Sequence, residues 1–185
     1  LLCGDALIVE AFSSLTRVAV ERGQTQRLPA LMAIIAGGVG APMGICAGQA
    51  WECESEVDLA RYHQAKTGAL FIAATCAGAA VAGADEAEWR ALGDAIGHSY
   101  QVADDILDAA ADAEVIGKPT GQDVSLNRPS AVRQFGLEGA VQHLRELVDA
   151  SVAAVPVCPG REQLQQLVRN QARRFLPKGL VVQAA

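Results

Sequence analysis

The sequence has 185 residues, and its 15 basic and 21 acidic side chains give a formal net charge of −6. Hydrophobic residues make up 51% of the chain and aromatic residues only 4%. This composition excludes an intrinsically disordered chain and favours closely packed helices over a β-sandwich. The acidic balance argues against a nucleic-acid partner, because binding to phosphates needs a surplus of Lys and Arg.

Two helices are predicted in the first 50 residues. Apolar residues at helical spacing predict the first over 5–21. The second is predicted over 29–48, within the uncharged stretch Leu28–Trp51. It should be irregular, because several glycines and two prolines break or bend a helix.

A third helix is expected to open at Ser55 and Glu56, with Ser55-x-x-Asp58 as an N-terminal cap that has acidic residues in the first turn. It runs through Lys66 into a second uncharged stretch, Thr67–Ala84. Both uncharged stretches are as long as a membrane span. Their small residues and lack of basic flanks favour buried helices of a soluble bundle, with a small membrane bundle as the alternative.

Three more helices are predicted over 86–113, 130–155 and 162–175, with a polar loop over 115–129. Strand patterns are nearly absent, so the predicted fold is a single all-α domain over residues 1–185. The five cysteines form no CxxC pair, which indicates a reduced, cytoplasmic compartment. Cys46, Cys53 and Cys76 are expected to fill the core. No signal peptide is visible, and the sequence opens on Leu1 rather than on Met.

Four polar residues of the fourth predicted helix share one face. Gln101, Asp104, Asp105 and Asp108 occupy positions i, i+3, i+4 and i+7. Aspartate is a poor residue inside a helix, and like charges one turn apart repel each other. Carboxylates held this close suit a hard cation, and Mg²⁺ is favoured if phosphate oxygens complete its shell. The alternative is a solvated polar face of a surface helix.

Two lysines add the positive charge that a metal–phosphate site also needs. Lys118 follows the aspartates in a loop rich in Gly and Pro, within reach of a phosphate that the metal would hold. Lys66, followed by Thr67, stands in the middle of the third predicted helix. Its alternative interpretation is a charge that extends to solvent at the end of the bundle.

Five ordered segments resemble the trans-isoprenyl diphosphate synthases. They are GDALIVEAF (4–12), GQAWE (48–52), HQAKTGALF (63–71), SYQVADDILD (99–108) and GKPTGQD (117–123). DDxxD alone is weak evidence, but the five in this order are highly specific. The stretch that begins GKPTGQD further resembles bacterial geranylgeranyl diphosphate synthases.

The resemblance implies an all-α homodimer with a deep cavity in which two aspartate-rich motifs bind Mg²⁺ and an allylic diphosphate. The implied site residues are Asp104, Asp105 and Asp108 as metal ligands of the second motif, Lys66, Lys118 and Arg128 as diphosphate-binding cations, Thr67 and Gln101 as polar residues near the reacting carbons, and Asp123 as a support for the lysine–metal network. Lys66, Thr67, Gln101, Asp104 and Asp105 are the implied catalytic set. Gln49 resembles a family glutamine, and Glu52 stands where relatives often have Asp.

The implied reaction joins isopentenyl diphosphate to an allylic prenyl diphosphate, and the subfamily resemblance favours farnesyl to geranylgeranyl diphosphate. The departing diphosphate serves as the base, so the three histidines need no acid–base role. The family's first aspartate-rich motif would precede Gly4, so the sequence is expected to be the C-terminal portion of the fold and inactive alone. Alternatives are a non-catalytic subunit that modulates an active synthase, and a terpene cyclase.

Overall fold

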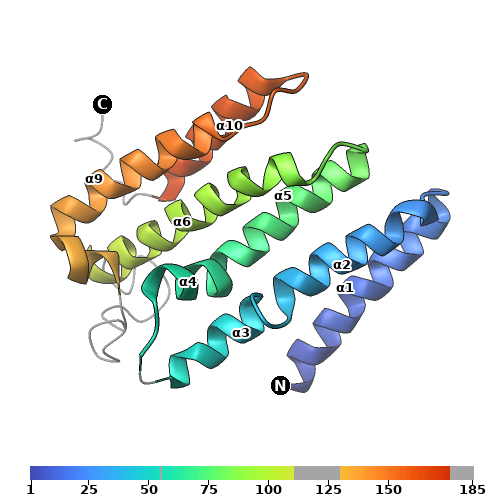
Figure 1. Ribbon diagram of the computed structural model, residues 1–185, viewed down its shortest axis with the longest axis horizontal. Coiled ribbons are helices and arrows are strands. Elements are labelled where there is room, and N and C mark those ends of the chain that lie inside the picture. Colours follow the sequence, from blue (N-terminus) through green and yellow to red (C-terminus); the bar gives the residue numbers. More distant parts are fainter. Residues whose placement is uncertain (55, 111–129, 176–185) are drawn as a thin grey trace.

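The computed structural model describes residues 1–54, 56–110 and 130–175, and these residues form helices and turns without a strand (Figure 1). This confirms the all-α fold class. The helices are α1 (Leu2–Glu21), α2 (Leu28–Val39), α3 (Ile45–Ala50), α4 (Leu59–His63), α5 (Ala69–Ala82), α6 (Ala87–Ala110), α9 (Ala131–Ala153) and α10 (Arg161–Phe175). Short 3₁₀ turns, η1 (Thr25–Arg27) and η2 (Trp51–Cys53), and a π-helical segment, η3 (Gln64–Gly68), complete the described elements.

The long helices lie side by side in an order that follows the chain. α1 packs on α2, α2 on α5, α5 on α6, and α6 on α9, while α10 lies against α9 and α6. In Figure 1, α1 and α2 therefore lie at one edge of the molecule and α9 and α10 at the other. The centre of this arrangement is the pair α5 and α6, and the candidate site is built around their ends.

The break predicted in the second helix is confirmed, and it divides the segment into α2 and α3. α2 ends at Val39 and α3 starts at Ile45, with a Gly/Pro-containing turn between them. Gly44 is its tightest point, because a Cβ there would lie 2.5 Å from the carbonyl oxygen of Gly40. After this turn α3 runs towards the segment formed by α4 and η3, and it packs against η3.

The start of the third predicted helix differs in detail from the expectation. Asp58 is the N-cap of α4, and its Oδ1 accepts a hydrogen bond of 2.8 Å from the backbone N–H of Arg61. Ser55 lies outside the described residues. The helix also changes from α to π geometry over Gln64–Gly68 before α5 continues it. Single π turns inside α-helices are frequent at functional sites, and the sequence pattern contained no sign of this one.

Two apolar clusters hold α6 against the C-terminal helices. One joins α6 to α9 through Val102, Ile106, Ala140 and Leu144. The other joins the start of α6 to α9 and α10 through Leu92, Val152 and Val168. Val102 and Ile106, which do not belong to the polar face of α6, are both buried. By contrast, two of the three cysteines expected in the core, Cys46 and Cys53, are exposed, and only Cys76 is buried. All five cysteines are free thiols.

Among the described residues, one continuous helix is long and apolar enough to cross a membrane by length and composition. It is the segment Ala60–Ala82, which comprises most of α4 with η3 and α5. Core helices of soluble proteins pass the same test, so this is weak evidence for a span.

Candidate active site

The polar face of α6 is largely buried. Asp105 is 3% exposed and Asp108 is 9% exposed, while Asp104 and Gln101 are partly exposed. This excludes the alternative of a solvated polar face for Asp105 and Asp108, because carboxylates are seldom buried without a partner or ligand.

The Asp105 carboxylate joins α6 to the start of α9. Its Oδ1 accepts a hydrogen bond of 2.9 Å from Gln101 Nε2, and its Oδ2 accepts one of 2.7 Å from the backbone N–H of Ala131. The Ala131 N–H belongs to the first turn of α9, where a negative charge is stabilised by the helix dipole. Asp105 therefore stabilises the fold as well as being a candidate ligand, a role that sequence reasoning missed.

A hydrogen bond joins Thr67 to Gln101. The Thr67 hydroxyl donates a hydrogen bond of 2.7 Å to Gln101 Oε1, so the π segment is tied to α6 at the polar face. Gln101 in turn donates to Asp105. A hydrogen-bonded path thus runs from η3 through α6 to α9. Glycines allow this approach, because a Cβ on Gly97 would lie 2.6 Å from the Cα of Gly68.

Lys66 is held by polar side chains from three other elements, and together they form what we call the Lys66 cluster: Gln49, Glu52, Tyr62 and Lys66. The Lys66 ammonium donates hydrogen bonds to Glu52 Oε1, with which it forms an ion pair, and to the Tyr62 hydroxyl at 2.8 Å. Tyr62 donates to the same Glu52 oxygen at 2.7 Å, and Gln49 donates to Glu52 Oε2 at 2.6 Å. Lys66 is therefore not a charge extending freely into solvent.

The contacts of the Lys66 cluster affect two pKa values. Burial lowers the pKa of Lys66, but its hydrogen bonds to Glu52 and Tyr62 outweigh burial and leave the pKa above its usual value. Burial is the main cause that raises the pKa of Tyr62. Lys66 is therefore cationic and Tyr62 neutral at physiological pH, which is the state that recognition of a diphosphate requires.

His63 lies next to Tyr62 and is uncharged. Burial, with smaller contributions from the nearby His98 and Lys66, lowers the pKa of His63 to about 4. Its Nε2 is buried and has no hydrogen-bond partner. A neutral imidazole adds no positive charge for a diphosphate.

The carboxylates of α6 suit Mg²⁺ by their chemistry. Within the described part of the chain, no three His, Cys, Asp or Glu side chains are gathered closely enough to hold a metal ion by themselves. Mg²⁺ is usually bound through one or two carboxylates, and water and substrate phosphates supply the other ligands. Asp104 and Asp108, one helical turn apart, satisfy that requirement. Lys118, Asp123 and Arg128 lie outside the described residues, so their places in the site stay predictions.

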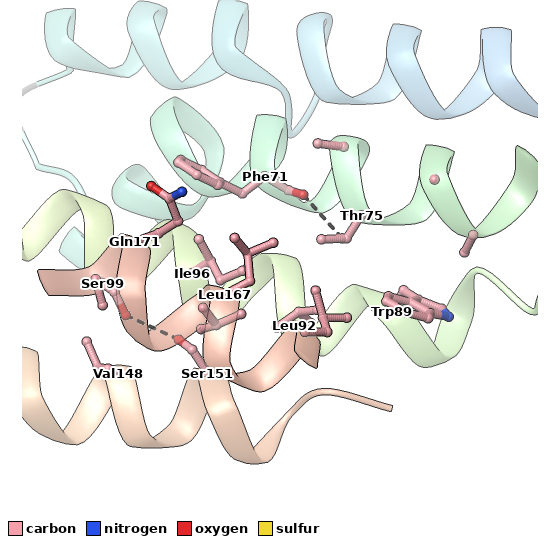
Figure 2. A pocket seen from close by; sticks show the side chains of 16 residues that line it. Phe71, Thr75, Trp89, Leu92, Ile96, Ser99, Val148, Ser151, Leu167 and Gln171 are labelled. Carbon is pink, nitrogen blue, oxygen red and sulfur yellow. Dashed lines mark hydrogen bonds between the residues drawn. The ribbon is translucent and has the colours of Figure 1, made fainter. Parts of the chain in front are cut away.

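An apolar cavity of about 520 Å³ lies between α5, α6, α9 and α10 (Figure 2). Phe71, which follows Thr67 by one helical turn, is one of the residues that line this cavity. Small residues of the second uncharged stretch line one of its walls. Leu92, Ile96 and Leu167 project into it, and a 3.3 Å hydrogen bond joins Ser99 to Ser151 at its edge. None of the predicted site residues that the structure describes lines this cavity.

Comparison with known proteins places this fold among the isoprenyl diphosphate synthases. A geranyltransferase from Helicobacter pylori, solved in complex with magnesium and isoprenyl diphosphate, has a TM-score of 0.78 at 26% identity over 92% of this chain and 59% of its own. A farnesyl/geranylfarnesyl (FPP/GFPP) synthase from Zymomonas mobilis gives a TM-score of 0.69 at 30% identity over 94% of this chain and 59% of its own.

The sequence comparisons define the family. The polyprenyl synthetase model matches residues 1–161, and the chain belongs to that family. It is 49% identical to the geranylgeranyl diphosphate synthase of Cereibacter sphaeroides over 96% of the chain and 61% of the relative. The corresponding enzyme of Rhodobacter capsulatus is 47% identical over 95% of the chain and 60% of the relative. The chain thus spans about three fifths of the length of these relatives.

Proposed function

We propose that this chain belongs to a prenyltransferase that condenses isopentenyl diphosphate with an allylic diphosphate, converting farnesyl to geranylgeranyl diphosphate. The observation that carries the proposal is the chain of hydrogen bonds from Thr67, the residue next to Lys66 in η3, through Gln101 to the Asp105 carboxylate of α6. It places a lysine that is suited to a diphosphate and carboxylates that are suited to Mg²⁺ on adjoining elements. The identity to two geranylgeranyl diphosphate synthases supports the choice of product.

In this proposal each side chain has a defined task in ionisation and coupling. Lys66, with Lys118 and Arg128, binds the diphosphate that leaves with the electron pair of the broken C–O bond. Asp104, Asp105 and Asp108 would hold Mg²⁺, which would supply positive charge to offset that of the leaving group, and the contact of Asp105 with Ala131 positions its carboxylate. Thr67 and Gln101 place their dipoles near the reacting carbons. The double bond of isopentenyl diphosphate attacks the allylic cation, and the departed diphosphate removes the proton.

The test is an assay of the protein at its natural length with farnesyl and isopentenyl diphosphates. We expect a C20 diphosphate as product, no product when EDTA removes divalent cations, and recovery of activity when MgCl₂ is added in excess. A product of another length would contradict the C20 assignment. An inactive protein that co-purifies with an active synthase would instead favour the non-catalytic subunit.

We also propose a homodimer formed through α1. This helix packs mainly on α2 and leaves large apolar side chains exposed, with Leu7, Val9 and Val20 each more than 60% exposed. Apolar exposure of this extent on one helix is typical of an interface between subunits. Sedimentation equilibrium should give twice the mass of one chain, and the mass of a single chain would contradict the proposal.

We propose a cytoplasmic protein without a membrane span or a nucleic-acid partner. Five free thiols and a net charge of −6 support this view.

A further inference from the structure

Tyr62 occupies an unusual place for a buried tyrosine. It is 5% exposed, and its hydroxyl lies between the two members of an ion pair. The hydroxyl donates to Glu52 Oε1 and accepts from Lys66 Nζ, at 2.7 and 2.8 Å. If Tyr62 served only to fill the core, a phenylalanine would be sufficient, because a buried hydroxyl adds a group that must be hydrogen-bonded.

The backbone explains why Tyr62 reaches Lys66. The two residues are four positions apart, at the junction where α4 changes into the π segment. The Lys66 ammonium also lies 5.2 Å from the centre of the Tyr62 ring, within the range of a cation–π contact. The phenol therefore restrains the lysine by its hydroxyl and by its ring, and Glu52 restrains both of them. A lysine fixed in this way loses less side-chain entropy when it binds an anion.

A diphosphate that draws Lys66 away would leave the Glu52 carboxylate with fewer donors. A partly buried charge that loses a partner is destabilised, so this exchange would be costly if Lys66 were the main donor. Tyr62 and Gln49 also donate hydrogen bonds to Glu52, and these two bonds do not involve the lysine that would turn to a ligand. The arrangement thus lowers the free-energy cost of releasing Lys66.

We propose that Tyr62 is a positioning residue that holds the Lys66 ammonium ready for a substrate diphosphate and keeps Glu52 hydrogen-bonded when Lys66 moves to that ligand. The inference rests on the proposed function, because it takes Lys66 as a diphosphate-binding residue. Tyr62 lies outside the set of residues predicted for the site, and it shares the Glu52 carboxylate with Lys66 and Gln49.

The experiment measures how fast acetic anhydride acetylates Lys66, by mass spectrometry across a range of pH, in the protein at its natural length. Tyr62→Phe removes one hydrogen bond to the ammonium while burial remains, so we expect the pKa of Lys66 to fall and its acetylation at a given pH to rise. Inorganic diphosphate with Mg²⁺ should protect Lys66 from acetylation. About tenfold more diphosphate should be needed to protect Lys66 in Tyr62→Phe than in the wild type. The factor corresponds to the loss of one hydrogen bond to a charged group, here the bond from Tyr62 to the Glu52 carboxylate.

The controls separate a positioning role from a structural one. Tyr100→Phe removes the hydroxyl of the other tyrosine in the chain, whose ring packs against Phe71, and should leave Lys66 labelling unchanged. Circular dichroism checks that each variant is folded. If Tyr62→Phe does not fold, ¹⁹F NMR of protein containing 3-fluorotyrosine gives a second test. The Tyr62 resonance should shift when diphosphate is added, and an unmoved resonance would overturn the proposal.

The two proposals fail in different ways. If diphosphate protects Lys66 equally well in wild type and in Tyr62→Phe, with the same acetylation profile, the role of Tyr62 is overturned and the proposed function stands. If diphosphate does not protect Lys66 even in the wild type, the diphosphate-binding role of Lys66 is overturned, and the inference about Tyr62 with it.

Discussion

Asp104→Ala is expected to lower Mg²⁺-dependent condensation about 100-fold or more while the protein stays folded. A loss of this size is typical when one group that stabilises developing charge is removed. Asp104 belongs to the polar face of α6 and is only partly buried, so its replacement should cost little stability. The measurement is a steady-state assay with farnesyl and isopentenyl diphosphates, together with thermal unfolding of the same samples.

A matched control comes from another helix. Asp149 is an exposed aspartate on α9, so Asp149→Ala makes the same chemical change on a surface away from the polar face of α6. We expect its activity to be near that of the wild type. If Asp104→Ala kept near wild-type activity, Asp104 would be removed from the site. If both variants lost activity equally, the effect would be one of net charge rather than of metal binding.

Gly48→Val is expected to have the largest effect on stability among single changes near the site. α3 packs so closely on the π segment that a Cβ at position 48 would lie 2.4 Å from the backbone nitrogen of Lys66 and 2.6 Å from its Cα. Overpacking usually costs about 1–3 kcal/mol, and backbone atoms cannot rotate away as a side chain can. We expect a decrease at the upper end of that range in the free energy of unfolding, measured with urea.

The same variant should also disturb the Lys66 cluster, because α3 must move away from η3 and carry Gln49 with it. Gly78→Ala is the matched control, since nothing lies within 4 Å of a Cβ at this position of α5. It should be neutral or stabilise the protein by about 0.5–1 kcal/mol, because alanine is the better helix residue. Equal stability of Gly48→Val and wild type would contradict the close contact between α3 and η3.

The helices could be predicted largely because each has a periodic apolar pattern and a recognisable end. The expected break near the glycines and prolines is the turn between Val39 and Ile45. The cap could be localised less well, because Ser55 and Asp58 are both good capping residues and only the backbone path selects Asp58. The π segment could not be predicted, because the apolar pattern of the sequence does not show where a turn contains an additional residue, as the turn over Gln64–Gly68 does.

The candidate site was predictable where residues share a helix and less so where they meet across helices. The common face of Gln101, Asp105 and Asp108 follows from helical spacing alone. Tyr62 escaped prediction because an aromatic residue at helical spacing is typical of a core position. Its role depends on the approach of Glu52 from η2, a contact between segments that local sequence does not encode. The contact between Asp105 and Ala131 is of the same kind, because it crosses from α6 to α9.

The π segment has a mechanical consequence. Neighbouring residues of a helix point in directions about 100° apart. Lys66 and Thr67 are neighbours, yet one contacts Glu52 and Tyr62 while the other contacts Gln101 on α6. Both side chains therefore turn together when the segment rotates about its own axis, and neither contact is altered alone by that rotation. A rotation of this single turn of backbone would therefore change the contacts of Lys66 and the contact of Thr67 with the polar face of α6 at the same time.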